Sequence, residues 1–220
     1  MNGWILKKII KGREPVSLTA YRSSVARADM GKPNIYEDYK ENAILRKQLL
    51  EEQGYLCCYC MSRISETKSK IEHFKAQSIF RDLQINYENL FIACKGGEGT
   101  TERCCDTLKG NSPLESVDFS LSIENEIKYS KKGHISSMAT TKKEMSLLTK
   151  EMNEVLNLNS NILVNNRKQT YEEFKSQIKG RWSKSNVQKA IIHYKKKHNG
   201  KYAPYSEMMV YLLTQKLRAL

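Results

Sequence analysis

The chain has 220 residues, of which 40% are hydrophobic and 28% charged, and it contains 11 glycines and 4 prolines. This composition excludes collagen-like and low-complexity chains, and a chain of this length can bury an ordinary hydrophobic core. The formal net charge of +13 favours an acidic partner such as nucleic acid. The longest apolar run, residues 208–213, is too short to cross a bilayer, and residues 1–10 lack a signal-peptide pattern. We therefore expect a soluble, cytoplasmic protein that does not contact a membrane.

The first part of the chain, residues 1–54, predicts an irregular segment followed by one helix. Pro15 and Pro33 interrupt the segment before the helix. Residues 36–53 are rich in Glu, Lys, Leu and Ala, which favours a helix that stops at Gly54. The side chains expected on its buried stripe are Ile44, Leu45, Leu49 and Leu50.

The middle of the chain holds all six cysteines, and their spacing indicates a metal site. Cys57 and Cys60 form a C-x2-C pair, which in an intracellular protein is typical of zinc ligands. Zinc prefers four ligands in a tetrahedron, and Cys94 with either Cys104 or Cys105 would complete the set. Such a zinc ion would be structural, because it would clamp a segment that has no large core of its own.

The last part of the chain, residues 116–220, predicts a hairpin and four helices. Residues 127–135 alternate in polarity around a turn signal at Gly133. Thr141 and Glu144 have the spacing of a capping box at the start of the first helix. The expected helices span residues 142–156, 160–179, 186–198 and 206–217.

This last part is also strongly basic. Eleven basic residues lie between Arg167 and Lys201, against only Glu172 and Glu173. Such a block attracts a polyanion by counterion release, although a solvated helix face would have the same composition. We therefore expect an α+β protein in three parts: an N-terminal segment and helix over residues 1–54, a zinc-stapled module over 55–115, and a hairpin with a basic helical region over 116–220.

Four residues between and directly after the cysteines stand in an order that indicates catalysis. Glu72 and His73 are adjacent, Asn89 precedes a leucine, and Asp106 directly follows the last cysteine. This order resembles the motif of the HNH nucleases, which have the ββα-metal fold. The resemblance implies that His73 is the general base, that Asn89 orients it, and that Glu72 and Asp106 bind a catalytic Mg²⁺ or Mn²⁺. The residue types suit these roles, because imidazole titrates near neutral pH and carboxylates suit hard cations.

A wider set of segments is similar to the HNH subunit of Septu antiphage systems, the PtuB type, and to its relatives in retron systems. The segments are QGYLCCYC, IEHFKAQS, NLFIACKGG, CCDTLKG and LNLNSNILVNNRK. This resemblance implies an endonuclease that works with an ABC/SMC-like ATPase subunit of the PtuA type. In retron systems a reverse transcriptase with its RNA–DNA hybrid is a further partner. The implied substrate is nucleic acid, with DNA favoured and RNA such as tRNA as the alternative.

Three positions depart from the pattern of that family. Ala76 replaces a usual proline, Cys58 replaces a small apolar residue, and Cys104 stands where histidine is frequent. Cys58 is therefore expected not to bind zinc. The fourth zinc ligand is either Cys104 or Cys105, and Cys105 is favoured because Asp106 directly follows it.

The lysines expected to contact nucleic acid are Lys75, Lys109, Lys195, Lys196 and Lys197. The alternative hypothesis is a non-catalytic, zinc-stapled nucleic-acid-binding or scaffold protein, which would explain the cysteines and the basic charge equally well. Only the endonuclease hypothesis explains the spacing of Glu72, His73, Asn89 and Asp106. A restriction or homing enzyme is disfavoured because no separate sequence-reading domain is evident.

Overall fold

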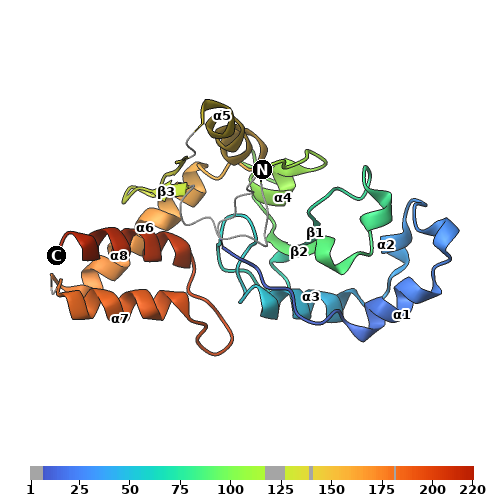
Figure 1. The fold of residues 1–220 in the computed structure, drawn as a ribbon, viewed down its shortest axis with the longest axis horizontal. Helices are drawn as coiled ribbons and strands as arrows, with labels where there is room; N and C mark the ends of the chain where they lie inside the picture. Colours follow the sequence, from blue (N-terminus) through green and yellow to red (C-terminus); the bar gives the residue numbers. More distant parts are fainter. Residues whose placement is uncertain (1–6, 117–126, 139–140, 181) are drawn as a thin grey trace.

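The computed structural model describes residues 7–116, 127–138, 141–180 and 182–220 (Figure 1). It confirms a mixed α+β architecture, in which helices surround two separate two-stranded antiparallel sheets. Within these ranges, none of the helices combines the length and the apolar character that a membrane span requires.

The N-terminal part contains more helix than its sequence predicts. Val16–Ser24 forms helix α1 and Arg27–Asp29 forms the 3-10 turn η1, so the prediction of an irregular segment is wrong. The carbonyl of Pro15 accepts hydrogen bonds from the amides of Leu18 and Thr19. Proline fits a helix start because its missing N–H would have no helical partner there. The fully buried Leu18 then anchors α1 to the core.

The helix predicted over residues 36–53 is interrupted, and forms α2 at Ile35–Asp38 and α3 at Asn42–Glu52. The break lies at Tyr39, whose backbone is extended and whose side chain is only 2% exposed. The Tyr39 hydroxyl also lies 2.8 Å from Ser17 Oγ, in a hydrogen bond with α1. Burial of this ring therefore overrides the local preference for helix.

Helix α3 packs one side against the core. Leu45, Leu49 and Leu50 are fully buried, as the sequence predicts, whereas Ile44 is half exposed. Gly54 lies just beyond the helix end with a φ of +59°, a conformation that glycine adopts without strain. The predicted stop signal is therefore confirmed.

The cysteine segment forms a hairpin followed by a short helix. Strands β1 (Ser69–His73) and β2 (Leu90–Cys94) pair in antiparallel fashion over their full length. The loop between them contains two 3-10 turns, η2 (Arg81–Leu83) and η3 (Tyr87–Asn89). Helix α4 (Cys105–Lys109) follows and packs against β2. The end of β1 and the start of α4 therefore belong to one small module.

The elements predicted for the last part of the chain are present. Strands β3 (Ile127–Tyr129) and β4 (Ile135–Ser137) form the expected hairpin. Thr141 Oγ1 accepts a hydrogen bond from the Glu144 amide, which confirms the capping box. The helix after it passes into a π-helical turn, η4 (Glu151–Val155). The four helices are α5 (Lys142–Lys150), α6 (Asn161–Ile178), α7 (Lys184–Lys195) and α8 (Ser206–Arg218).

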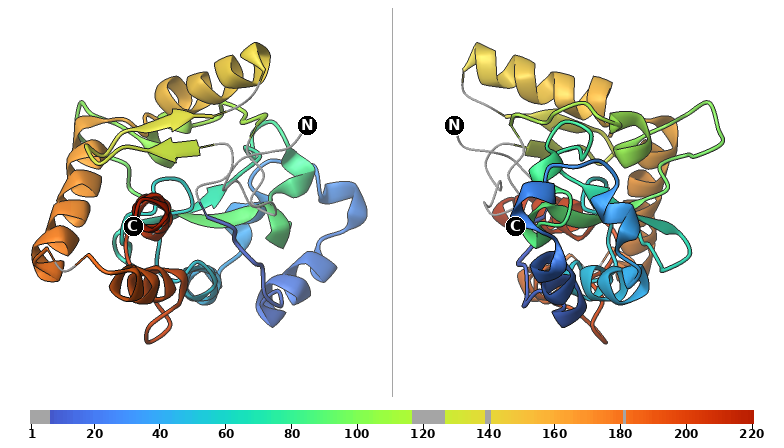
Figure 2. Two further views of the ribbon diagram at one scale, coloured as in Figure 1. Left: turned by 60° about the vertical axis from the view of Figure 1, so that its left-hand side comes forward. Right: turned by 90° about the vertical axis from the view of Figure 1, so that its right-hand side faces the viewer.

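The hairpin of β3 and β4 lies between helices, because α5 packs against β4 and α8 packs against β3 (Figure 2). Helices α6, α7 and α8 lie at the opposite end of the molecule from α1, with β1 and β2 between them (Figure 1). Three main-chain hydrogen bonds join the last part of the chain to the first two parts: Tyr202 N to Gly54 O (3.1 Å), Tyr205 N to Met61 O (3.1 Å) and Cys105 N to Leu156 O (2.9 Å). The division into three parts remains a prediction, since contacts cross its second boundary.

Replacing Gly133 with alanine should lower the free energy of unfolding by roughly 3 kcal/mol. Gly133 lies in the turn between β3 and β4 with a φ of +90°, and a Cβ atom there would lie 2.1 Å from Val164 O of α6. About 1–2 kcal/mol of the loss comes from the left-handed backbone, and the rest from forcing the turn away from α6. Gly200→Ala is the control, because Gly200 has a φ of +75° but no atom within 4 Å of its Cβ position. Equal losses in a denaturant titration of the two variants would contradict the steric argument.

Candidate metal centre and active site

Four cysteine sulfurs form a compact group that could hold a zinc ion. The Sγ atoms of Cys57, Cys60, Cys94 and Cys105 all lie within 4.8 Å of one another, and the Cys60 and Cys94 sulfurs are 3.8 Å apart. Four sulfurs placed about 2.3 Å from a tetrahedral zinc are separated by about 3.8 Å, so the group has the right dimensions. Four thiolates also leave no open position for substrate, which is typical of a structural site. The four cysteines that the sequence predicts as ligands therefore lie together in a group that could hold zinc.

The backbone decides which of the neighbouring cysteines joins this group. Cys105, at the start of α4, has a φ of +54° and its sulfur lies in the group, whereas Cys104 lies outside it. Cys58 is buried but also lies outside the group, as the sequence predicts. The loop before α4 requires a glycine, because a Cβ atom on Gly96 would lie 2.0 Å from Cys104 O. The backbone of Gly96 therefore packs directly against the residue that precedes Cys105.

Glu72, on β1, is a buried carboxylate with several polar partners. Its Oε1 atom accepts a hydrogen bond from the Tyr59 hydroxyl (2.7 Å) and forms an ion pair with Lys109 Nζ (2.8 Å). Burial and a hydrogen bond with Asp106 raise the pKa of Glu72 to about 8, although Lys109 opposes the rise. Asp106, which the sequence pairs with Glu72, therefore lies near enough to influence the pKa of Glu72.

The backbone holds the imidazole of His73 in one tautomer. His73 Nε2 lies 2.9 Å from the carbonyl oxygen of Gln84. A carbonyl only accepts hydrogen bonds, so Nε2 carries the hydrogen and Nδ1 is the basic nitrogen. The ring of Tyr36 packs edge-on against the imidazole, with the centroids 4.5 Å apart. Burial lowers the pKa of His73, so the ring is neutral near pH 7 and can accept a proton.

Asn89 fixes the backbone that follows β1. Its Oδ1 atom accepts a hydrogen bond from the Lys75 amide (2.7 Å), and its Nδ2 donates to the carbonyls of Lys75 (3.0 Å) and Leu83 (3.1 Å). The amide of Phe74 donates to the Asn89 carbonyl (3.0 Å). These bonds join the two ends of the loop beside His73. Asn89 therefore positions the imidazole through the main chain.

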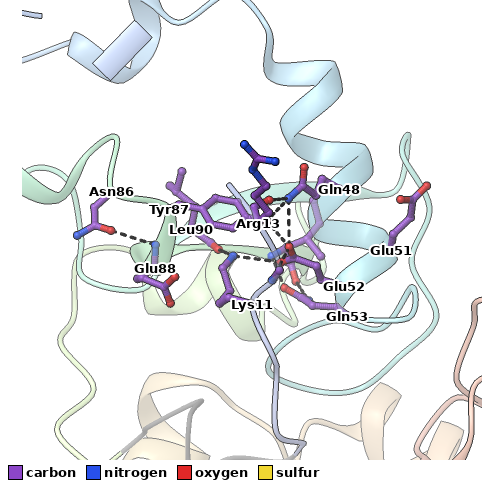
Figure 3. A network of polar contacts seen from close by, with 12 residues as sticks. Lys11, Arg13, Gln48, Glu51, Glu52, Gln53, Asn86, Tyr87, Glu88 and Leu90 are labelled. Carbon is purple, nitrogen blue, oxygen red and sulfur yellow. Dashed lines mark hydrogen bonds and ion pairs between the residues drawn. The ribbon is translucent and has the colours of Figure 1, made fainter. Parts of the chain in front are cut away.

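A polar network braces the start of β2 against α3 and the N-terminal segment (Figure 3). Glu52, at the end of α3, accepts a hydrogen bond from the Tyr87 hydroxyl and pairs with Lys11 Nζ at 3.4 Å. Lys11 Nζ also donates to Leu90 O (2.8 Å) and lies 3.8 Å from the centroid of the Tyr87 ring. Burial lowers the pKa of Lys11, and the Glu52 carboxylate opposes this change. The network therefore holds in place the strand that ends at a cysteine of the metal group.

Lys109 is buried, whereas a lysine that contacts phosphates is expected on the surface. Its side chain is 1% exposed, and its ammonium is paired with Glu72. Nζ also faces the backbone carbonyls of His73 and Gly110, each at 3.4 Å. A buried ammonium requires such partners because its desolvation is unfavourable. Lys109 is therefore part of the buried cluster.

The other four predicted lysines have exposed side chains. Lys75 lies in the loop after β1, beside the buried cluster. Lys195 and Lys196 lie at the end of α7 and are fully open to an acidic partner. Lys197 Nζ donates to the last two carbonyls of α3, at 2.7 and 3.1 Å. A cation at this position also stabilises the helix end, so Lys197 has a structural contact in addition to its charge.

Three residues that contact the cluster were not singled out in the sequence. Tyr59 lies inside the C-x2-C turn. A tyrosine buried there needs a polar partner for its hydroxyl, and this requirement is the signal in the sequence that could have identified Tyr59. Gln84 and Tyr36 contact His73 only because the loop after β1 and the α2 segment fold back onto it. No local pattern in the sequence indicates those two contacts.

The fold and the site define a class of protein: a four-cysteine module that could bind zinc and that carries a buried ion pair between Glu72 and Lys109, with Asp106 and His73 half-buried nearby. No protein-family model matches this chain, and neither does any curated protein sequence.

Proposed function

We propose that the protein is a metal-dependent endonuclease of the HNH type that hydrolyses phosphodiester bonds in nucleic acid, with zinc in a structural role. The observation that supports this most is the placement of two carboxyl groups: Asp106 is close enough to Glu72 to raise its pKa, and His73 follows Glu72 on β1. A neutral imidazole and two carboxylates are the kinds of group that metal-assisted hydrolysis requires, and here the side chains of His73 and Glu72 leave opposite faces of β1. The order of a hairpin and then a short helix fits the ββα-metal arrangement.

In this proposal His73 is the general base. Its Nε2 hydrogen is engaged by the Gln84 carbonyl, so Nδ1 takes the proton of the attacking water. Glu72 and Asp106 are the residues that would hold a catalytic Mg²⁺ or Mn²⁺, since carboxylate oxygens are the donors these ions prefer. The bound ion would offset the negative charge that develops on the phosphate and the leaving oxygen. Lys109 limits the rise in the pKa of Glu72, because the ammonium favours the charged carboxylate.

The substrate and the partners of this proposal follow from the resemblance and from the surface charge. The exposed lysines Lys75, Lys195 and Lys196 suit contact with phosphates, which carry no base information. DNA is the favoured substrate, and RNA such as tRNA is the alternative. The proposed partners are an ABC/SMC-like ATPase that gates cleavage and, in a retron form, a reverse transcriptase with its RNA–DNA hybrid. The proposed setting is cytoplasmic antiphage defence.

His73→Ala tests the assignment. The variant should lose 10²- to 10⁴-fold in cleavage rate, as expected when a general base is removed. It should keep one zinc per chain, because His73 is not among the four cysteine ligands. The measurement is cleavage of labelled DNA and RNA by the complex with its ATPase, with Mg²⁺ or Mn²⁺, alongside zinc content by mass spectrometry.

The matched control is His134→Ala, because His134 is an exposed histidine in the turn between β3 and β4. This variant should cut at the wild-type rate. If His73→Ala also cuts at the wild-type rate, the endonuclease assignment is refuted.

The second candidate function is a non-catalytic, zinc-stapled nucleic-acid-binding or scaffold protein. One observation favours it: Lys109 already neutralises Glu72, as in a purely structural ion pair. This candidate predicts a wild-type complex that binds nucleic acid but cuts neither DNA nor RNA under any metal condition. It also predicts that His73→Ala leaves binding unchanged.

A further inference from the structure

The guanidinium of Arg167 is buried in the middle of the last part of the chain. Arg167 lies on α6 and its side chain has 0% exposure. Its Nε donates to Gly133 O and its Nη2 donates to Leu158 O, both at 2.6 Å. Its Nη1 is buried without a hydrogen-bond partner. Within the part of the chain that the structure describes, no carboxylate forms an ion pair with it.

A buried cation without a counter-charge is strongly unfavourable, because little solvent remains to stabilise it. Two backbone carbonyls supply partial negative charge, but they leave the full positive charge of the guanidinium uncompensated. Arginine also cannot escape this cost by losing its proton, since its pKa is too high. Negative charge close to Arg167 would therefore stabilise the folded protein.

The four-cysteine group is connected to Arg167 by a short stretch of backbone. The Leu156 carbonyl accepts the Cys105 amide (2.9 Å), and two residues later the Leu158 carbonyl accepts Arg167 Nη2. Burial lowers the pKa of Arg167, and Tyr129, Cys60, Tyr205 and Cys105 are near enough to oppose this change when they are ionised, as Cys60 and Cys105 would be when bound to zinc. Both Cys60 and Cys105 belong to the metal group. The guanidinium therefore lies within the electrostatic reach of the thiolates.

A zinc ion held by four thiolates carries a net charge of −2, which is itself unfavourable in a buried site. The four sulfurs are buried or nearly so, with Cys60 and Cys105 at 0% exposure. We propose that Arg167 is the internal counter-cation of this tetrathiolate zinc site, so that α6 stabilises the bound metal across the module boundary. The inference rests on the zinc site and does not depend on nuclease activity, so the two can fail separately.

Arg167→Met tests the proposal, because it removes the charge while it keeps an unbranched side chain in the same space. Zinc affinity should fall roughly tenfold to a hundredfold, the usual effect of losing a group that supports metal ligands from outside. The measurement is competition for zinc with a chromophoric chelator, on purified full-length protein. Arg167→Lys should retain most of the affinity, because it keeps the charge. Lys168→Met, an exposed neighbour on α6, should retain all of it.

A double-variant cycle with Cys60→His separates charge compensation from simple packing. Histidine is a neutral zinc ligand, so this change lowers the negative charge of the site by one. Arg167→Met should therefore cost several-fold less zinc affinity in the Cys60→His background than in the wild type. Additive effects would overturn the proposal, because hydrogen bonds to Gly133 and Leu158 do not depend on the ligand charge. Failure of Arg167→Lys to fold in excess zinc would also overturn it, since the donors rather than the charge would then be essential.

Discussion

Cys105→Ser should release the zinc and unfold the cysteine module. A structural zinc site contributes on the order of 10 kcal/mol of folding free energy, and serine is a poor zinc ligand, so the expected loss is about 5 kcal/mol or more. Cys105 is fully buried, and its amide also holds the Leu156 carbonyl. The variant should bind less than one zinc per chain and should melt without a cooperative transition, as measured by mass spectrometry and calorimetry.

Cys104→Ser is the matched control for this change. Cys104 is the adjacent residue and is also buried, but its sulfur lies outside the group of four. The control should keep one zinc and lose less than about 1.5 kcal/mol. If Cys104→Ser releases the metal and Cys105→Ser keeps it, the ligand assignment is reversed.

Lys109→Met should destabilise the protein by roughly 3 kcal/mol in the absence of added Mg²⁺ or Mn²⁺. Removing one partner of a buried ion pair leaves the other without compensation, and Glu72 is only 3% exposed. Lys75→Met removes a lysine of the same module that is exposed and should change the stability by less than about 0.5 kcal/mol. Urea titrations of the two variants at pH 9 measure the difference.

The loss in Lys109→Met should depend on pH. The pKa of Glu72 is raised from 4.5 to about 8 on folding, so its contribution to stability is fully present below pH 4.5 and is lost as the pH rises towards 8. Lys109 opposes this rise, so the pKa of folded Glu72 increases further in Lys109→Met. The variant therefore continues to lose stability up to a higher pH than the wild type does. The difference between wild type and variant should therefore be larger at pH 9 than at pH 6. A difference that is constant over this range would show that Glu72 is not the partner that matters.

The elements that the sequence predicts correctly are those with local signals. The C-x2-C turn and the sulfur that directly precedes Asp106 form the metal group, because a zinc site depends on ligand type and short spacing. The last four helices are also predicted well, because Thr141 and Ser160 provide caps. The hairpin after the cysteines follows from its turn glycine, Gly133.

The elements that the sequence does not predict depend on contacts between distant residues. Tyr39 interrupts a helix because its ring is buried against the core and bonds to Ser17, and neither effect is visible in a window of helix propensity. Lys109 follows Asp106 closely in a basic chain, so a surface role is the natural expectation. Lys109 is buried because it pairs with Glu72, which lies 37 positions earlier in the sequence. The pairing of β1 with β2 brings the two residues together.

The three main-chain bonds that join the last part of the chain to Gly54, Met61 and Cys105 can form only late in synthesis. A ribosome releases the N-terminal residues first, so the carbonyls of Gly54 and Met61 emerge long before the amides of Tyr202 and Tyr205 that they accept. The turn that contains Cys57 and Cys60 therefore cannot form its last main-chain contact until Tyr205 has been synthesised. A nascent chain that has made only the first 115 residues lacks these bonds and the guanidinium of Arg167. Completion of the site is thus delayed until late in translation.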